Sequence, residues 1–326
     1  MNKFLVALFA IACLAASTQA VSIKWTGYAN NGQWFTPTNW YPDQVPSTED
    51  DVTIDSGVVT VPQAAGCNSL TMGTNFNNQA NLTIFNTFIV GSGGMTVDGN
   101  GFVFVNAGTA SINGPVNIAG YLYFQSGSLS GQVTISSRGV ADLSGLAQKV
   151  LTGCSFSSAG TLTLGGNLVL NQSSQFSVTS TATVSGNFAV QNGDGSAVLF
   201  DTSAGTLTYT GAGTFSMQAP VSLGTFNFAT ESPANLTVYS DVTFVNSFDI
   251  PKGSMVSTLG IAKVNMSSGV TGAGILSGAS AQLLLGNVNF TGAINSVGGN
   301  VTFASGKNAV SLLTLDGGDL NVKAST

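Results

Sequence analysis

The chain has 326 residues, of which 43% are apolar and only 7% are charged; it has no histidine and a formal net charge of −6. This composition excludes a charge-rich disordered chain, and it offers no basic surface to nucleic acid or to an anionic membrane. Without histidine, a Ser-His-Asp or Cys-His catalytic arrangement is excluded, as is the commonest metal ligand.

Residues 1–20 predict a secretory signal peptide. Lys3 is followed by an apolar run from Phe4 to Leu14 and then by small residues that end at Ala20. This is the order of the basic, apolar and cleavage regions of such peptides. The run is shorter than the roughly 20 residues that span a bilayer, so we expect no membrane insertion. The mature protein is therefore expected to be secreted, and to be extracellular or at a cell surface.

Residues 21–55 form a distinct segment that contains all three tryptophans, Trp25, Trp34 and Trp40. The first coil of a stacked β-protein has an apolar face that needs cover, and indoles are large side chains whose N–H groups can still reach a partner. We therefore expect this segment to be an N-terminal cap. The alternative is a platform on which the indole faces stack against sugar rings.

The motifs of this segment follow a recognisable order. They are Trp25-Thr-Gly27, Gly32-Gln-Trp34, Asn39-Trp40, Val45-Pro46 and Asp50-Asp-Val-Thr-Ile54. This order resembles the N-terminal segment of bacterial β-helical surface proteins, namely autotransporter passengers and haemagglutinin-like adhesins. The resemblance implies a parallel β-helix with a surface or adhesive role.

Residues 56–326 predict a right-handed parallel β-helix. Runs such as Gly101–Val105 and Asn235–Val238 alternate apolar and polar residues, as strands with one buried face do. The strands begin about seven residues apart, so three of them make a coil of about 21 residues and about twelve coils fit. An antiparallel sandwich or a propeller would require longer spacings. Residues 143–151 are the only stretch that we consider as a short helix.

The last residues, Asp316 to Thr326, have the residue pattern of another coil and not that of the membrane β-barrel of autotransporters. An uncovered coil end presents unpaired backbone groups and templates association. Either the chain is a fragment of a longer one, or another molecule covers this end, and end-to-end self-association is the form of cover that we expect.

Cys67 and Cys154 are the two cysteines that follow the signal peptide. In an oxidising compartment they could form a disulfide. In a regular solenoid they would lie about four coils apart, and four steps of ~4.8 Å far exceed the ~5.5 Å that a disulfide spans. Two buried free thiols are the preferred interpretation.

We predict no catalytic residue, and a polysaccharide lyase or glycoside hydrolase is the alternative. A lyase would need Arg or Lys beside clustered acids, but Arg138 has only Asp142 near it in the sequence. A hydrolase would need carboxylates that converge from neighbouring coils. The candidate carboxylates are widely spaced in the sequence: Asp194, Asp201, Asp241 and Asp249.

No cofactor is predicted, and calcium is a minor alternative. Oxygen ligands suit calcium, and they occur at Glu49-Asp50-Asp51 with Asp55, and in the turns at 98–101 and 316–319. Turn chemistry explains these acids without a metal. Six sequons would accept N-glycans in a eukaryotic host: Asn81, Asn171, Asn235, Asn265, Asn289 and Asn300.

These patterns together favour a secreted structural or adhesive protein of a cell surface or extracellular matrix. Its expected partner is a cell-surface or matrix polysaccharide, and carbohydrate binding is the form of adhesion that we consider. The preference for a non-enzymatic role depends mostly on the missing histidine and on the lack of paired carboxylate motifs.

Overall fold

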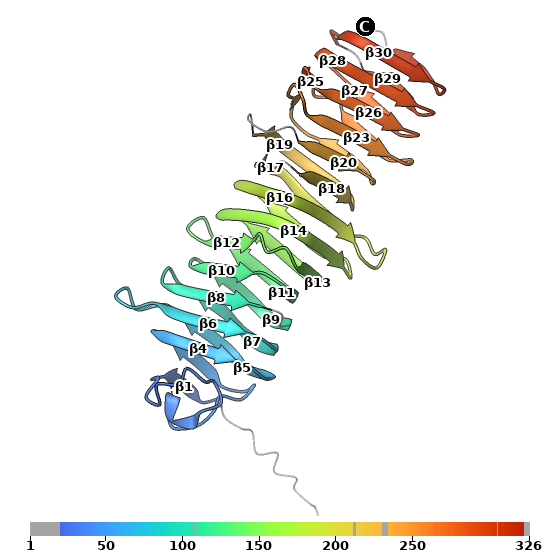
Figure 1. Cartoon of the computed structure of the whole chain (residues 1–326). Coiled ribbons are helices and arrows are strands. Elements are labelled where there is room, and N and C mark those ends of the chain that lie inside the picture. Colours follow the sequence, from blue (N-terminus) through green and yellow to red (C-terminus); the bar gives the residue numbers. More distant parts are fainter. Residues whose placement is uncertain (1–19, 107–108, 211–212, 230–233, 305, 323–326) are drawn as a thin grey trace, which may run out of the picture.

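The computed structural model describes residues 20–106, 109–210, 213–229, 234–304 and 306–322. Over these ranges the chain is a parallel β-solenoid of about 13 turns, which Figure 1 shows as a stack from the blue N-terminal end to the red C-terminal end. The predicted parallel β-helix is confirmed, with about one turn more than expected. The predicted signal peptide lies almost wholly outside the described residues.

The first strands build the N-terminal turns. They are β1 (Ser22–Trp25), β2 (Trp40–Tyr41), β3 (Asp51–Ile54), β4 (Gly57–Val61), β5 (Ala65–Met72), β6 (Ala80–Ile84), β7 (Thr87–Val97), β8 (Gly101–Val105), β9 (Thr109–Ile118) and β10 (Tyr121–Phe124). A single 3-10 turn, η1 (Pro37–Asn39), precedes β2, and within the described ranges no helix is long and apolar enough to span a bilayer.

The middle and C-terminal turns continue the stack. The middle strands are β11 (Gly127–Ile135), β12 (Val140–Leu143), β13 (Gln148–Ser158), β14 (Thr161–Asn171), β15 (Gln175–Val178), β16 (Thr181–Asn192), β17 (Leu199–Tyr209), β18 (Thr214–Gln218), β19 (Val221–Phe228), β20 (Asn235–Val238) and β21 (Val242–Phe244). The last strands are β22 (Phe248–Ile250), β23 (Met255–Leu259), β24 (Lys263–Met266), β25 (Val270–Gly272), β26 (Ile275–Ala279), β27 (Gln282–Leu285), β28 (Val288–Val297), β29 (Asn300–Phe303), β30 (Ala309–Asp316) and β31 (Leu320–Val322).

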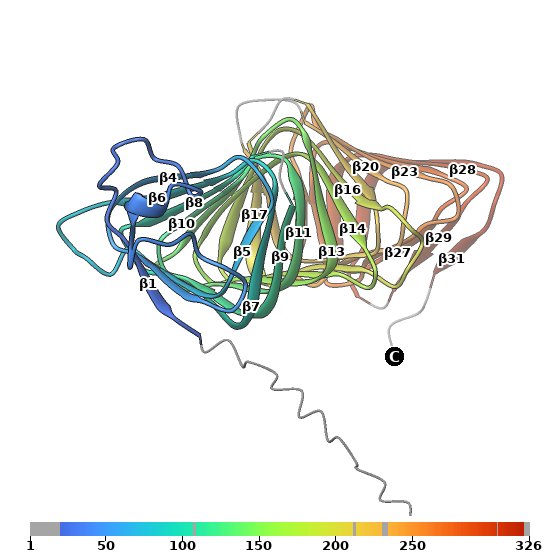
Figure 2. The same ribbon diagram turned by 90° about the horizontal axis from the view of Figure 1, so that it is seen from below.

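The strands form one continuous 31-stranded sheet that winds around the solenoid, which Figure 2 shows from below. The pairings from turn to turn divide it into three faces, which we call sheets 1, 2 and 3. Sheet 1 begins with β1, β3 and the end of β5, and finishes with β21, β24, β27, β29 and β31. Sheet 2 begins with β4, β6, β8, β10 and β12. Sheet 3 includes the start of β5 and, later, β18, β20, β23 and β26.

Residues paired on neighbouring turns are separated by about one coil length in the sequence. The separation ranges from 133 − 116 = 17 residues for Val116 and Val133 to 52 − 23 = 29 for Ile23 and Val52. The predicted coil of about 21 residues falls within this range. The variation is taken up in the turns, since loops tolerate insertions better than stacked strands do.

Many strands are longer than the sequence predicts, because they continue around a corner of the solenoid. β7, for example, pairs on sheet 3 through Val90 and on sheet 1 from Met95, with a shift of register between them. The corner contains Gly94 at φ 76°, a conformation that glycine adopts without strain. The chain therefore bends while its ladder of hydrogen bonds continues on both sides.

The core is built from columns of apolar side chains that point inward. On sheet 1, Phe156, Phe176 and Phe200 stack with centroids 4.7 and 5.0 Å apart and planes within 3°. This spacing follows the distance of about 4.8 Å between strands, so rings on neighbouring turns stack face to face. The same column continues with aliphatic side chains, Val133 before Phe156 and Val221 after Phe200.

Residues 143–151 are not helical, and the helix that we considered there is wrong. The segment joins β12 to β13, and Val150 and Leu151 pair with Val169 and Leu170 of the next turn. Pairing with an adjacent rung on a pleated, half-buried surface outweighs local helix propensity.

Candidate functional site: a polar groove on sheet 1

The three tryptophans form a buried cluster at the N-terminal end. The exposed fraction is 0% for Trp34 and Trp40 and 5% for Trp25. Trp40 contacts both other indoles edge-to-face at centroid distances of 4.8 Å, and its Nε1 donates to the Trp34 carbonyl at 2.7 Å. This burial favours packing over a sugar platform, and the cap stays the preferred interpretation of the cluster.

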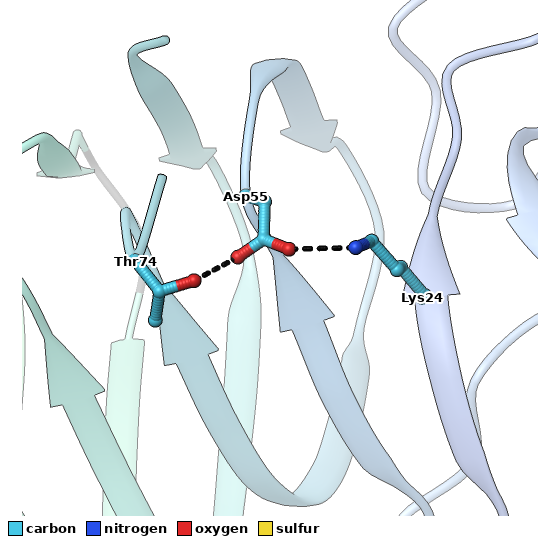
Figure 3. Close-up of polar contacts among 3 residues, drawn as sticks. All are labelled: Lys24, Asp55 and Thr74. Atoms are coloured by element: carbon cyan, nitrogen blue, oxygen red, sulfur yellow. Dashed lines mark hydrogen bonds and ion pairs between the residues drawn. The ribbon is translucent and has the colours of Figure 1, made fainter. Parts of the chain in front are cut away.

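The cap is tied to the first coils by polar contacts (Figure 3). Lys24 on β1 forms a salt bridge of 2.8 Å with Asp55, and the Thr74 hydroxyl donates to the same carboxylate. Both hydrogen bonds lower the pKa of Asp55 below its usual value, Lys24 contributing most. The carboxylate therefore links three successive chain segments of the N-terminal end.

Cys67 and Cys154 are free and buried. Burial raises the pKa of each thiol to about 12; at Cys67 the nearby Asp51 and Asp50 add to this effect. The ladder from β5 through β7, β9 and β11 to β13 separates the two residues by four turns. The structure therefore favours unreactive thiols, since the thiolate is the reactive form.

The acids of the N-terminal segment each have separate partners. Asp50 accepts hydrogen bonds from the backbone N–H groups of Val21 and Ser47, and Asp51 accepts from Asn68 and Ser69. Over the ranges that the structure describes, no three His, Cys, Asp or Glu side chains gather where they could hold a metal ion. The geometry therefore adds nothing to the calcium alternative.

The four carboxylates of the hydrolase alternative do not gather in one place, although Asp201 and Asp241 both lie on the outward side of sheet 1. Asp201 lies on sheet 1 and caps the N–H of Ser203, whereas Asp249 belongs to β22 and accepts from Thr271. Asp194 lies in the turn between β16 and β17 and accepts from Gln172 and Ser196, which lower its pKa. These local hydrogen bonds explain the three acids as turn and ladder residues.

The six sequons lie on or beside strands. Asn235 and Asn289 are exposed. The other four are half-buried in the outward columns: Asn81, Asn171, Asn265 and Asn300.

A shallow polar groove of about 440 Å³ lies on sheet 1, across β24, β27, β29 and their neighbours. Two outward columns line it. One column runs Asp241, Lys263, Gln282, Asn300, and the other runs Thr243, Asn265, Leu284, Thr302, Asn321. We call these nine residues the polar groove.

Apart from Leu284, the polar groove is a surface of hydrogen-bonding groups with little charge. Gln282 and Thr243 are exposed, while Asn300 and Thr302 are half-buried. Asp241 accepts from the backbone N–H of Lys263 at 2.9 Å. Within the described ranges the Lys263 ammonium makes no salt bridge, so it is available to a ligand.

Hydroxyl and amide side chains both donate and accept hydrogen bonds. Because successive rungs place these groups at a regular spacing of about 4.8 Å, the polar groove suits an extended ligand with repeated hydroxyl groups. A single ammonium and a single free acid do not make an anion-binding cluster.

The sequence does not predict the polar groove. Asp241 is considered above only as a hydrolase carboxylate, and Asn265 and Asn300 only as sequons. The groove is assembled from five strands far apart in the sequence, so no local motif marks it.

None of the protein-family models, curated proteins or solved structures compared with this chain matches it. The structure supports the resemblance to bacterial surface proteins at the level of a β-solenoid with a Trp-rich N-terminal region, and no family is assigned.

Proposed function

We propose that this protein is a secreted structural or adhesive component of a cell surface or extracellular matrix, and that it binds polysaccharide through the polar groove. The observation that carries the proposal is the pair of outward columns that places amide and hydroxyl groups on consecutive rungs of one sheet. A rigid solenoid holds these groups in place before the ligand arrives, which lowers the entropic cost of binding.

The test is a glycan array combined with a turnover assay on neutral and acidic polysaccharides. The variant Lys263→Ala/Gln282→Ala/Asn300→Ala removes three side chains from one column. We expect it to lose about tenfold or more in affinity, which corresponds to roughly one or two lost hydrogen bonds.

A matched control uses the same sheet outside the polar groove. Thr134 and Ser157 occupy the outward column that continues into Thr243 and Asn265, several turns away. Thr134→Ala/Ser157→Ala should bind like the wild type. The proposal fails if no glycan binds, if the groove variant binds unchanged, or if the wild type cleaves polysaccharide with turnover.

A further inference from the structure

Four aromatic side chains stand on the outward face of sheet 2, on β8 and β10. Phe102 stacks on Tyr121 with a centroid distance of 4.4 Å and an interplanar angle of 2°, and Phe104 stacks on Tyr123 at 4.6 Å and 6°. All four are half-buried. We call these four residues the aromatic wall.

The aromatic wall is two rings deep along the solenoid axis and two rings wide along the strand. Tyr121 and Tyr123 lie side by side with centroids 6.3 Å apart and planes within 9° of each other. Each stacked pair covers one face of its members and leaves the opposite ring face directed at the next rung. The aromatic wall therefore has two outer faces. Phe102 and Phe104 (the Phe pair) form one, and Tyr121 and Tyr123 (the Tyr pair) form the other.

Next to each outer face, the neighbouring rung carries shorter side chains. In the same columns the rung next to the Phe pair holds Asn81 and Thr83 on β6. The rung next to the Tyr pair holds Val140 and Asp142 on β12. A phenyl ring extends farther from a sheet than any of these side chains, so part of each outer face stays open above them.

The face that surrounds the wall is nearly uncharged. Its outward columns continue through Thr161, Thr181 and Thr206 and through Thr163, Thr183 and Thr208. From β4 to β19 the charged side chain in these columns is Asp142, which accepts a hydrogen bond from the N–H of Ser144.

We propose that the aromatic wall is a second contact site for a neutral polysaccharide chain, which packs its C–H faces against the outer ring faces. The inference rests on the proposed function and adds the ligand class. Aromatic faces are electron-rich and attract the weakly positive C–H groups of a sugar ring, and Asn81 and Thr83 lie beneath to bond its hydroxyls.

The charge of the protein and the small area of the aromatic wall disfavour ligands other than a neutral polysaccharide. The net charge of −6 and the lone Asp142 on this face disfavour uronic-acid polymers and nucleic acids. A stable protein interface buries at least about 1,000 Å² around a continuous apolar centre, and four half-buried rings with mostly polar neighbours fall short of that.

The test compares retention on microcrystalline cellulose and on chitin, with soluble polygalacturonate as the acidic comparison. The variant Phe102→Thr/Phe104→Thr/Tyr121→Thr/Tyr123→Thr installs the residue that already occupies these columns on β14, β16 and β17. We expect at least about tenfold weaker retention. Tyr121→Phe/Tyr123→Phe keeps the rings and should bind as the wild type does.

Thr181→Ala/Thr183→Ala, on the same sheet, is the matched control, and circular dichroism checks the fold. Should the fourfold variant unfold, Phe104→Thr/Tyr123→Thr removes one column and is measured in the same way.

The inference is overturned if the ring-deleted variant keeps wild-type retention, or if the wild type prefers polygalacturonate. If only the groove variant loses binding, the proposed function stands without the wall; if the wild type binds no glycan, both fail.

Discussion

Lys149 is fully buried on β13, where its ammonium donates hydrogen bonds to the carbonyls of Gly145 and Ala147. Desolvation lowers the pKa of Lys149 from 10.5 to about 8, and the negative charge of Asp142 raises this pKa by a smaller amount. Between these two values the unfolded chain binds more protons than the folded one. The contribution of Lys149 to the free energy of unfolding therefore rises with pH from about 8 to 10.5.

We predict that this rise is lost in Lys149→Met. Cys67 and Cys154 have raised pKa values and make stability fall over the alkaline range, so the informative quantity is the difference between wild type and variant. Chemical denaturation at several pH values measures the free energy of unfolding of both proteins. The difference between wild type and variant should grow in favour of the wild type above pH 8 and stay constant below it. A constant difference across the window would contradict the assignment.

The two thiols give a second prediction at this scale. In the folded protein at pH 8, neither Cys67 nor Cys154 should react with an aromatic disulfide reagent, because both are buried and protonated. Both should react once guanidinium chloride unfolds the chain. A denatured, unreduced sample with no reactive thiol would instead indicate a disulfide.

At the level of elements, the solenoid depends on columns of inward apolar side chains that pack from turn to turn. The Phe156, Phe176 and Phe200 column joins β13, β15 and β17 through parallel stacked rings. Phe176 is the middle ring and is fully buried. Its removal would leave a cavity that touches two neighbouring turns.

Phe176→Ala should therefore lower the free energy of unfolding by about 3–5 kcal/mol, as buried Phe-to-Ala changes do. Phe176→Leu keeps much of the volume and should cost clearly less. Urea denaturation followed by fluorescence or circular dichroism measures both. Equal effects of the two substitutions would mean that the column is not packed as described.

At the level of the whole molecule, each turn contacts mainly the turns before and after it, so stability is close to a sum of neighbour terms. The first turn has a neighbouring turn on one side, and we predict that the Trp cluster covers its other side. Trp34 packs on Phe88 at a centroid distance of 5.2 Å. Covering this end stabilises the following turns as well. End-to-end self-association stays a prediction, and light scattering at high protein concentration tests it.

Trp40→Ala should destabilise the protein by about 3–5 kcal/mol, and hydrogen exchange should rise first in β3 to β7 and least in β23 to β28. Glycan binding at the polar groove should not change, because the indole is buried and the groove lies many turns away. Trp40→Phe is the control with a smaller loss of volume. If Trp40→Ala lost glycan binding but kept the stability of the wild type, the Trp cluster would be a binding site and not a cap.

The sequence alone determined the repeating features. Period-2 alternation, frequent Gly and Asn, and a low charge content predict short stacked strands, and three capping indoles predict a covered end, because these are local consequences of burial on one face. The four rings of the aromatic wall were also visible in principle: Gly101–Val105 and Tyr121–Phe124 are apolar on both faces, which a strand with one buried face does not require.

Only the tertiary structure decided which side chains share a rung. It buried the indoles, separated Cys67 from Cys154, and replaced the short helix considered at 143–151 by strands. It also assembled the polar groove from Asp241 to Asn321. Coils vary between 17 and 29 residues, so a uniform repeat accumulates error from turn to turn. The register that brings the groove residues together is set by pairing between whole coils and not by any local pattern.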